Sequence, residues 1–339
     1  MSDLQGGGDR TPVSPAEARA FPHPEPTPYH LMLRTWTYAW WRPVVGVLLG
    51  WVAFFVLASI VFFAVAAVWA LFQSGPWTSD LAANTDINDL AAPGLLGLNL
   101  GIGSMILVTW LLIRFLHRMR PRWLASVVPR LRWRFLVICL GLSCVALVAQ
   151  VVAGTLIPGA TGDEPGVELN SFTTATAISA LVVLLTTPLQ AAGEEYFFRG
   201  YLLQAIGSFF RSRWVAIVLT AVLFALAHGA QNPPLFVDRL AFGLIAGWLV
   251  TRTGGLEAGI ALHIVNNFVA FGFALSFGDL ATTLNVTEVS WWNIVLTVTQ
   301  SGVYTVLVLV LARRLGLQTH TRPPGSAPQP DPGRSVSAA

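Results

Sequence analysis

Long runs of apolar residues, separated by short polar stretches, make up most of the chain. An apolar run of roughly 20 residues is long enough to cross the hydrocarbon core of a bilayer as a helix. The pattern therefore predicts an all-α fold, a polytopic integral membrane helix bundle of about eight transmembrane helices. The expected spans are residues 44–72, 94–116, 135–157, 172–206, 214–229, 235–251, 255–277 and 291–312.

The composition excludes an ordinary soluble domain. Hydrophobic residues make up 54% of the chain and charged residues 11%, with a mean hydropathy of +0.64. Soluble domains contain about 25% charged residues. We therefore expect a multi-pass protein of the cell membrane, with the lipid bilayer as its constant partner. No sequence motif indicates nucleotide or nucleic-acid binding.

The placement of the basic residues predicts the orientation. All 20 are arginines, and seven of them lie between Arg114 and Arg134, in the loop after the second expected span. The alternate loops carry mainly acidic residues, such as Asp80 and Asp163. Because cytoplasmic loops collect basic residues, we expect an even number of crossings and two cytoplasmic termini.

The polar ends and the motifs divide the chain into five parts. Residues 1–40 are rich in proline and are expected to be a disordered cytoplasmic tail, and residues 315–339 a second disordered tail. Residues 41–171 should form three transmembrane helices without a recognised motif. Residues 172–277 should form a four-helix core that carries the unusual polar side chains, and residues 278–314 the last transmembrane helix.

Three charged residues lie in the apolar segment 172–206. Ionisable groups are costly inside a bilayer and usually have a function there. Glu194 and Glu195 are adjacent and point about 100° apart on a helix, so different roles are expected for them. Glu195 and Arg199 are four residues apart with the acid first, which favours an ion pair, either structural or catalytic. Glu194 then has no charged partner in its own helix, which suits a general base.

Three further polar residues lie in later spans. His228 stands near the end of the span 214–229, where a hydrogen bond to a neighbouring carbonyl would explain it equally well. His263 and Asn267 share one helix face and need polar neighbours or a wet cavity. A rise of about 1.5 Å per residue puts these three residues and Glu194 in one slab of the membrane, so we expect them to meet.

Three short motifs thus follow one another on separate spans. They are Glu194-Glu195-x-x-x-Arg199, Phe224-x-x-x-His228 and His263-x-x-x-Asn267. In this order they resemble the CAAX protease and bacteriocin-processing membrane endopeptidases (CPBP or ABI, CAAX prenyl protease 2 type). The segment from Phe242-Gly243 to Gly247 resembles the small-residue helix of that family. The resemblance covers about residues 180–275.

The resemblance implies hydrolysis of peptide bonds within the membrane. Glu194, helped by His228, would activate a water molecule, and His263 with Asn267 would hold the oxyanion. Glu195 and Arg199, as supporting residues, would orient Glu194. The implied substrate is a membrane-associated protein or peptide, processed in the manner of a CAAX sequence.

A metal-dependent version of the same site remains open. Glu194, His228 and His263 could bind a divalent metal such as zinc, with water in the fourth position. Asn267 is a poor zinc ligand and a good amide donor, which favours a site without a cofactor.

Two other classes of protein are also consistent with the sequence. One is a catalytically inactive relative that acts as a membrane scaffold or confers immunity to a bacteriocin. The other is a transporter coupled to protons or cations. The transporter is less expected, because the first three spans carry no counterpart of the polar motifs.

Overall fold

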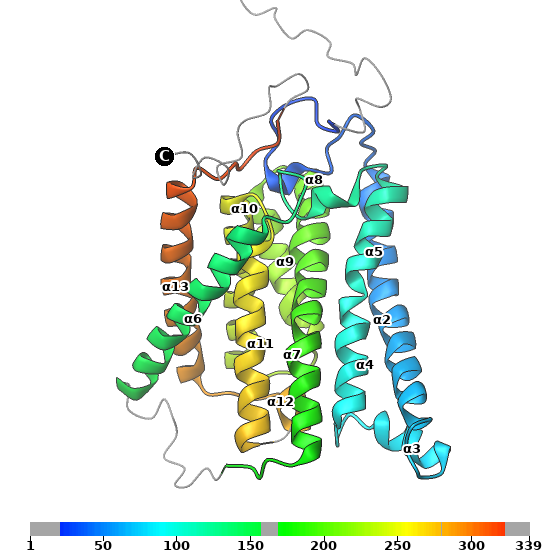
Figure 1. The fold of residues 1–339 in the computed structure, drawn as a ribbon. Coiled ribbons are helices and arrows are strands. Elements are labelled where there is room, and N and C mark those ends of the chain that lie inside the picture. The colour runs from blue at the N-terminus through cyan, green and yellow to red at the C-terminus, as the bar shows by residue number, and fades with distance from the viewer. Residues whose placement is uncertain (1–20, 157–168, 279, 323–339) are drawn as a thin grey trace, which may run out of the picture.

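The computed structural model describes residues 21–156, 169–278 and 280–322. Over these residues the chain is a bundle of long helices standing side by side, as the sequence predicted (Figure 1). Helices satisfy their own backbone hydrogen bonds, which a bilayer core demands. The elements are η1 (Tyr29–Leu31), α2 (Trp41–Ala70), α3 (Trp77–Asn84), α4 (Ala92–Gly103), α5 (Met105–Leu111), η2 (Leu112–Leu116), η3 (Pro121–Leu124), α6 (Trp133–Leu156), α7 (Thr174–Glu195), η4 (Tyr196–Leu202), α8 (Leu203–Phe210), α9 (Arg213–Ala227), α10 (Pro233–Thr253), α11 (Glu257–Phe277), α12 (Leu280–Leu284) and α13 (Trp291–Arg314).

Within the described ranges, seven helices are long and apolar enough to cross a membrane. The remaining expected span, 214–229, is the 15-residue helix α9. Fifteen residues rise only about 22 Å, less than the roughly 30 Å of hydrocarbon. The helix ends early because Gly229 adopts a φ of +78°, a left-handed conformation that terminates helices. The protein is thus a multi-pass integral membrane helix bundle with one short helix in its core.

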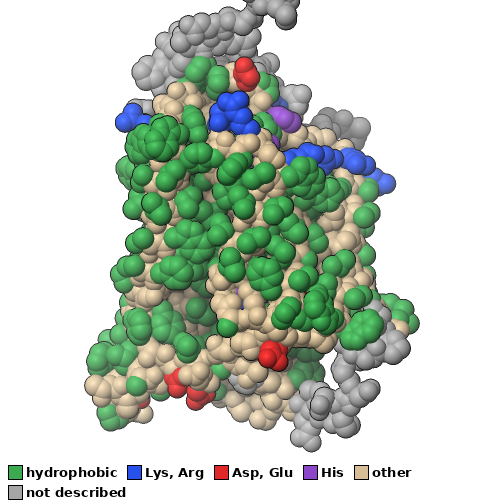
Figure 2. All heavy atoms as spheres, turned by 180° about the vertical axis from the view of Figure 1, so that it is seen from behind, with side chains coloured by type: hydrophobic (Ala, Val, Ile, Leu, Met, Phe, Trp, Pro, Cys, Tyr) green, Lys and Arg blue, Asp and Glu red, His purple; other side chains and the backbone are tan. Residues whose placement is uncertain are grey.

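Charged side chains are separated along the bundle axis. Arginines gather around one end, most acidic side chains lie at the other, and apolar side chains cover the surface between them (Figure 2). The arginine-rich end is also where α8 and the described ends of both terminal segments lie (Figure 1). This separation agrees with the predicted orientation, which stays a prediction.

Part of the N-terminal tail is ordered, which corrects the expectation of disorder over residues 1–40. Residues 21–40 pack across the arginine-rich end of the bundle, and Tyr29 and Met32 are fully buried there. The Tyr29 hydroxyl donates to the Leu124 carbonyl. The proline-rich composition suggested that this segment would bury too little apolar surface to become ordered. Burial of these apolar side chains instead offsets the conformational entropy that the segment loses. Residues 1–20 lie outside the described residues.

The beginning of the C-terminal tail is ordered too. Thr27 donates its backbone N–H to the Thr321 hydroxyl at 3.0 Å, and the Thr321 N–H donates to the Thr27 carbonyl at 2.9 Å. The two terminal segments therefore hold each other against the bundle, and the expectation of disorder fails for residues 315–322. Residues 323–339 lie outside the described residues.

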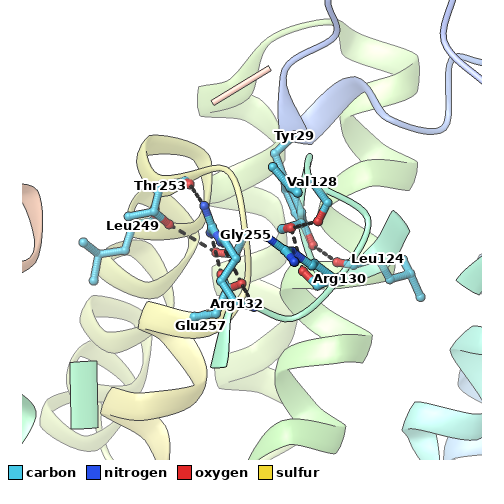
Figure 3. Close-up of polar contacts among 10 residues, drawn as sticks. Tyr29, Leu124, Val128, Arg130, Arg132, Leu249, Thr253, Gly255 and Glu257 are labelled. Atoms are coloured by element: carbon cyan, nitrogen blue, oxygen red, sulfur yellow. Dashed lines mark hydrogen bonds and ion pairs between the residues drawn. The ribbon is translucent and has the colours of Figure 1, made fainter. Parts of the chain in front are cut away.

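A polar clamp fixes the start of α11 (Figure 3). Arg132 Nε donates to Glu257 Oε1 at 2.8 Å, and Arg132 Nη2 contacts Oε2 at 2.5 Å. The same guanidinium donates to the Thr253 carbonyl at 3.0 Å. Glu257 is fully buried and is the first residue of α11. The clamp therefore ties the loop before α6 to the end of α10 and the start of α11.

Glycines let the central helices approach closely. A Cβ atom on Gly193 of α7 would overlap the Ile102 carbonyl oxygen of α4. Similarly, a Cβ on Gly243 of α10 would lie 2.9 Å from the Ala221 Cα of α9. Small residues at helix contacts are typical of membrane bundles. These contacts bring α4 against α7 and α9 against α10, while α11 packs on the other side of α7.

Candidate active site

The segment that carries the double glutamate changes its helical winding at that point. Residues Thr174–Phe210 form one continuous helical stretch of 37 residues. It is α-helical up to Glu195 and becomes a π-helix over Tyr196–Leu202. Such π-helical turns often occur at functional sites. The two glutamates are therefore the last residues of α7, and Arg199 lies in the π-helical part.

Glu195 contacts both Arg199 and His263. Arg199 Nη1 donates to Glu195 Oε1 at 2.8 Å, and His263 Nδ1 lies 3.0 Å from the same oxygen. Glu195 and Arg199 are fully buried. The Arg199 guanidinium also lies over the ring of Phe224, 4.1 Å from its centroid. The predicted ion pair is present, and Glu195 additionally orients the histidine of α11.

One carboxylate oxygen of Glu194 is held by a hydrogen bond, and the other is buried without a hydrogen-bond partner among the described residues. Gln190, one turn earlier on α7, donates from Nε2 to Glu194 Oε1 at 2.6 Å. Glu194 Oε2 has no hydrogen-bond partner among the described residues and lies 3.6 Å from His263 Nε2. The side chain is almost completely buried. A carboxylate with one fixed oxygen and one unpartnered oxygen beside an imidazole has the geometry of a general base.

Gln190 also links Glu194 to Asn267. Asn267 Nδ2 donates to Gln190 Oε1 at 2.7 Å. An ionised carboxylate only accepts hydrogen bonds, so Gln190 must turn its NH₂ toward Glu194 and its oxygen toward Asn267. Glu194 is therefore the acceptor at the end of a chain of two amide hydrogen bonds that starts at Asn267.

The same reasoning fixes the proton on His263. Its Nδ1 faces the Glu195 carboxylate and must carry a hydrogen. When the ring is neutral, Nε2 is free to accept; when the ring is charged, Nε2 also donates toward Glu194.

His228 lies at the edge of this network. Its Nδ1 lies 2.8 Å from the Phe224 carbonyl oxygen, which corresponds to the ordinary carbonyl hydrogen bond that the sequence left open. The side chain is exposed. The Phe224 ring lies between the two histidines, with centroids 4.7 Å from His228 and 6.0 Å from His263. Among the described residues His228 makes no hydrogen bond to Glu194, His263 or Asn267.

The backbone of α11 comes unusually close to Glu195. A Cβ atom on Gly259 would lie 2.7 Å from Glu195 Oε2, so only glycine leaves room for the carboxylate. Phe242 of α10 packs against His263, with the centroids of the two rings 5.1 Å apart. These close contacts of Gly259 and Phe242 fix the positions of the His263 and Glu195 side chains relative to each other.

The expected metal ligands do not form a site. In the part of the chain that the structure describes, no three His, Cys, Asp or Glu side chains are grouped to hold a metal ion. Glu194 and His263 are adjacent, but His228 turns its Nδ1 to a backbone carbonyl. These residues do not fit a metal in this arrangement.

The sequence reasoning missed two contributors to the site, Gln190 and Gly259. Gln190 stands four residues before Glu194, a spacing at which helical side chains hydrogen-bond. That signal was available in the sequence. Gly259 gives no comparable signal, because its importance depends on which side chain α11 meets.

The fold and the site together define a multi-pass membrane protein with buried carboxylate and imidazole groups. Residues 176–269 match the family model described as type II CAAX prenyl endopeptidase, Rce1-like. That range contains every predicted site residue. The match confirms the resemblance to the CAAX protease and bacteriocin-processing family over these residues.

One curated relative is the protein named uncharacterized protein YyaK of Bacillus subtilis (strain 168). It is 25% identical over 191 residues, which cover 53% of this chain. The matched part spans 62% of the length of that relative. No solved structure matches the chain.

Proposed function

We propose that the protein is an intramembrane endopeptidase that hydrolyses a peptide bond of a membrane-associated protein or peptide. The observation that carries this proposal is the state of Glu194, whose Oε1 accepts from Gln190 and whose buried Oε2 has no hydrogen-bond partner among the described residues and lies 3.6 Å from His263 Nε2. A buried carboxylate arranged in this way is suited to taking a proton from water. The family match supports the same class of reaction.

In the proposed reaction, Glu194 Oε2 takes a proton from a water molecule as the water oxygen bonds to the scissile carbonyl carbon. The electron pair of the carbonyl double bond moves to its oxygen. His263, held through Nδ1 by Glu195, donates a hydrogen bond from Nε2–H to that oxyanion. The proton on Glu194 then passes to the departing nitrogen as the C–N bond breaks. The products are a new carboxyl terminus and a new amine.

Asn267 and His228 assist this reaction. Asn267 uses one N–H on Gln190, and its second N–H is available to the oxyanion. His228 binds the Phe224 carbonyl through Nδ1, so its neutral ring offers Nε2 as an acceptor for the attacking water. We propose this metal-free form because an amide chain from Asn267 to Glu194 orients a base by hydrogen bonds alone.

The experiment that tests the function is cleavage of a library of membrane-associated peptides, including lipidated CAAX peptides, by the protein purified in detergent. Substitutions His263→Ala and His228→Ala should each abolish cleavage, and Asn267→Ala should slow it, while the helical circular dichroism is retained. Wild-type rates in His263→Ala would reject the oxyanion assignment. A wild-type protein that cleaves no peptide would reject the endopeptidase.

A further inference from the structure

Arg239 is an arginine in the membrane-spanning helix α10 for which the described residues provide no direct ion pair, although its chain neighbour Asp238 lies within electrostatic range. Elsewhere in the bundle, Arg199 pairs with Glu195 and Arg132 pairs with Glu257. Arg239 Nη1 instead donates to the amide oxygen of Gln231 at 2.9 Å, and the described residues place no carboxylate within ion-pair distance of it. A charged residue within a membrane helix usually has a partner or a function.

Arg239 lies on the face of α10 that borders the site. It is three residues before Phe242, so the two share a helix face, with Arg239 one turn nearer the Pro233 end. The Phe242 ring lies 5.1 Å from that of His263. Arg239 lies within electrostatic range of its chain neighbour Asp238 and also of Glu194 and His228. The guanidinium is therefore beside the reaction centre, on the side away from the arginine-rich end.

Gln231 holds this arrangement in place. Its Nε2 donates to the Ala225 carbonyl at the end of α9 at 2.7 Å, which turns its oxygen toward Arg239. Only one of the five guanidinium N–H groups is used in that bond. Arg239 is neither buried nor fully exposed. Its other donors are therefore available to a ligand that enters the site.

We propose that Arg239 binds the free C-terminal carboxylate of the peptide substrate. This proposal rests on the proposed function and names the feature of the substrate that the site recognises. A guanidinium matches a carboxylate with two parallel hydrogen bonds. A carboxylate brought into the bundle requires such a cation, since an unpaired buried charge is strongly disfavoured.

The position of Arg239 sets the direction in which the peptide lies. A CAAX sequence is the last four residues of a protein, so a bond within it lies at most about three residues, or roughly 10 Å, from the terminal carboxylate. With the carboxylate at Arg239, the upstream chain runs past Glu194 toward the arginine-rich end. That end is the predicted cytoplasmic one, where a soluble domain attached to the peptide would remain.

The test uses two fluorescent peptides with a prenylated cysteine four residues from the end, identical except for a terminal carboxylate or amide. Their binding is measured on Glu194→Gln protein in detergent, which keeps the peptides intact. We expect the acid to bind about tenfold more tightly than the amide. Adding Arg239→Gln should remove this difference and leave amide binding unchanged. Adding Arg252→Gln, an exposed arginine at the other end of α10, should preserve the difference.

Equal binding of the two peptides by the parent protein would overturn the proposal. An equal loss of affinity for the acid and the amide peptide in Arg239→Gln would also overturn it. A purely structural role for Arg239 beside α9 would weaken the binding of both peptides. Cleavage by the wild type separates this proposal from the proposed function. If the peptide acid binds more tightly but the wild type cleaves no peptide, only the proposed endopeptidase function is rejected. If cleavage depends on Glu194 but the acid and amide peptides bind equally, only the carboxylate site at Arg239 is rejected.

Discussion

Gln190 donates a hydrogen bond to Glu194 at 2.6 Å and accepts one from Asn267 at 2.7 Å. One buried amide thus connects the proposed base on α7 with a polar residue on α11. Buried hydrogen bonds to a charged group are stronger than neutral ones. The position of the base therefore depends on a residue that belongs to none of the three motifs.

Replacing this amide should impair the reaction more than the fold. In Gln190→Leu, Glu194 loses the bond that fixes its Oε1, and we expect kcat to fall about ten- to a hundredfold with KM little changed. Steady-state cleavage kinetics and thermal unfolding measure the two effects. Gln300→Leu, a buried glutamine on α13 away from the site, is the matched control and should retain kcat. An equal loss of kcat in Gln190→Leu and Gln300→Leu would contradict the role of Gln190 in positioning Glu194.

Gly259 should tolerate no side chain. Gly259→Ala would place a methyl group against Glu195 Oε2, and we expect unfolding to become easier by about 1–3 kcal/mol, with activity reduced. Gly272→Ala on the same helix is the control, because a Cβ there meets nothing within 4 Å. Thermal unfolding of both variants in the same detergent measures this difference. Equal stability of the two would show that α11 moves to accommodate the methyl group.

The buried ion pair should matter for stability as well as for activity. Arg199→Gln leaves Glu195 fully buried with only His263 beside it, and we expect a loss of about 3–5 kcal/mol in the free energy of unfolding. The exposed Arg122→Gln should change stability by less than about 0.5 kcal/mol. Denaturant or thermal unfolding in detergent provides the comparison. An unchanged stability in Arg199→Gln would mean that the pair is dispensable to the fold.

Buried histidines near the arginine-rich end should make stability depend on pH. Burial lowers the pKa of His23 to about 4 from an ordinary 6.5, and burial likewise lowers the pKa of His117 to about 4. Between these values the unfolded chain binds more protons than the folded one. Stability is therefore full above about pH 6.5 and falls toward pH 4, by about 1.4 kcal/mol per pH unit for each histidine.

Thermal unfolding between pH 7.5 and 5 measures this dependence. Burial also lowers the pKa of His30. His23→Leu removes one of these three histidines and should therefore reduce the slope. A slope that is the same in wild type and His23→Leu would show that His23 does not contribute to it.

The sequence predicted those parts of the molecule that depend on one helix at a time. The apolar runs gave the spans, and the spacing of Glu195 and Arg199 gave their ion pair. Counting residues from helix ends correctly brought Glu194 and His263 to one depth. Each of these inferences needs only the helical repeat and the rise per residue.

Three features of the structure were not predicted from the sequence. The sequence did not show that α9 ends at Ala227, because the conformation of Gly229 decides it. It also did not show that His263 shares Glu195 with Arg199, because that contact depends on the close approach of α11 at Gly259. The ordered segment 21–40 was missed because polar, proline-rich composition hides the few apolar side chains that the bundle buries.

The most direct test of the central claim is the cleavage rate of one peptide substrate by wild type and by Glu194→Gln, with the metal content of both preparations measured by mass spectrometry. We predict cleavage by the wild type without stoichiometric metal, and no detectable cleavage by Glu194→Gln with the fold retained. Cleavage at the wild-type rate by Glu194→Gln would contradict the assignment of Glu194 as the base. Cleavage that requires a bound metal would contradict the metal-free mechanism.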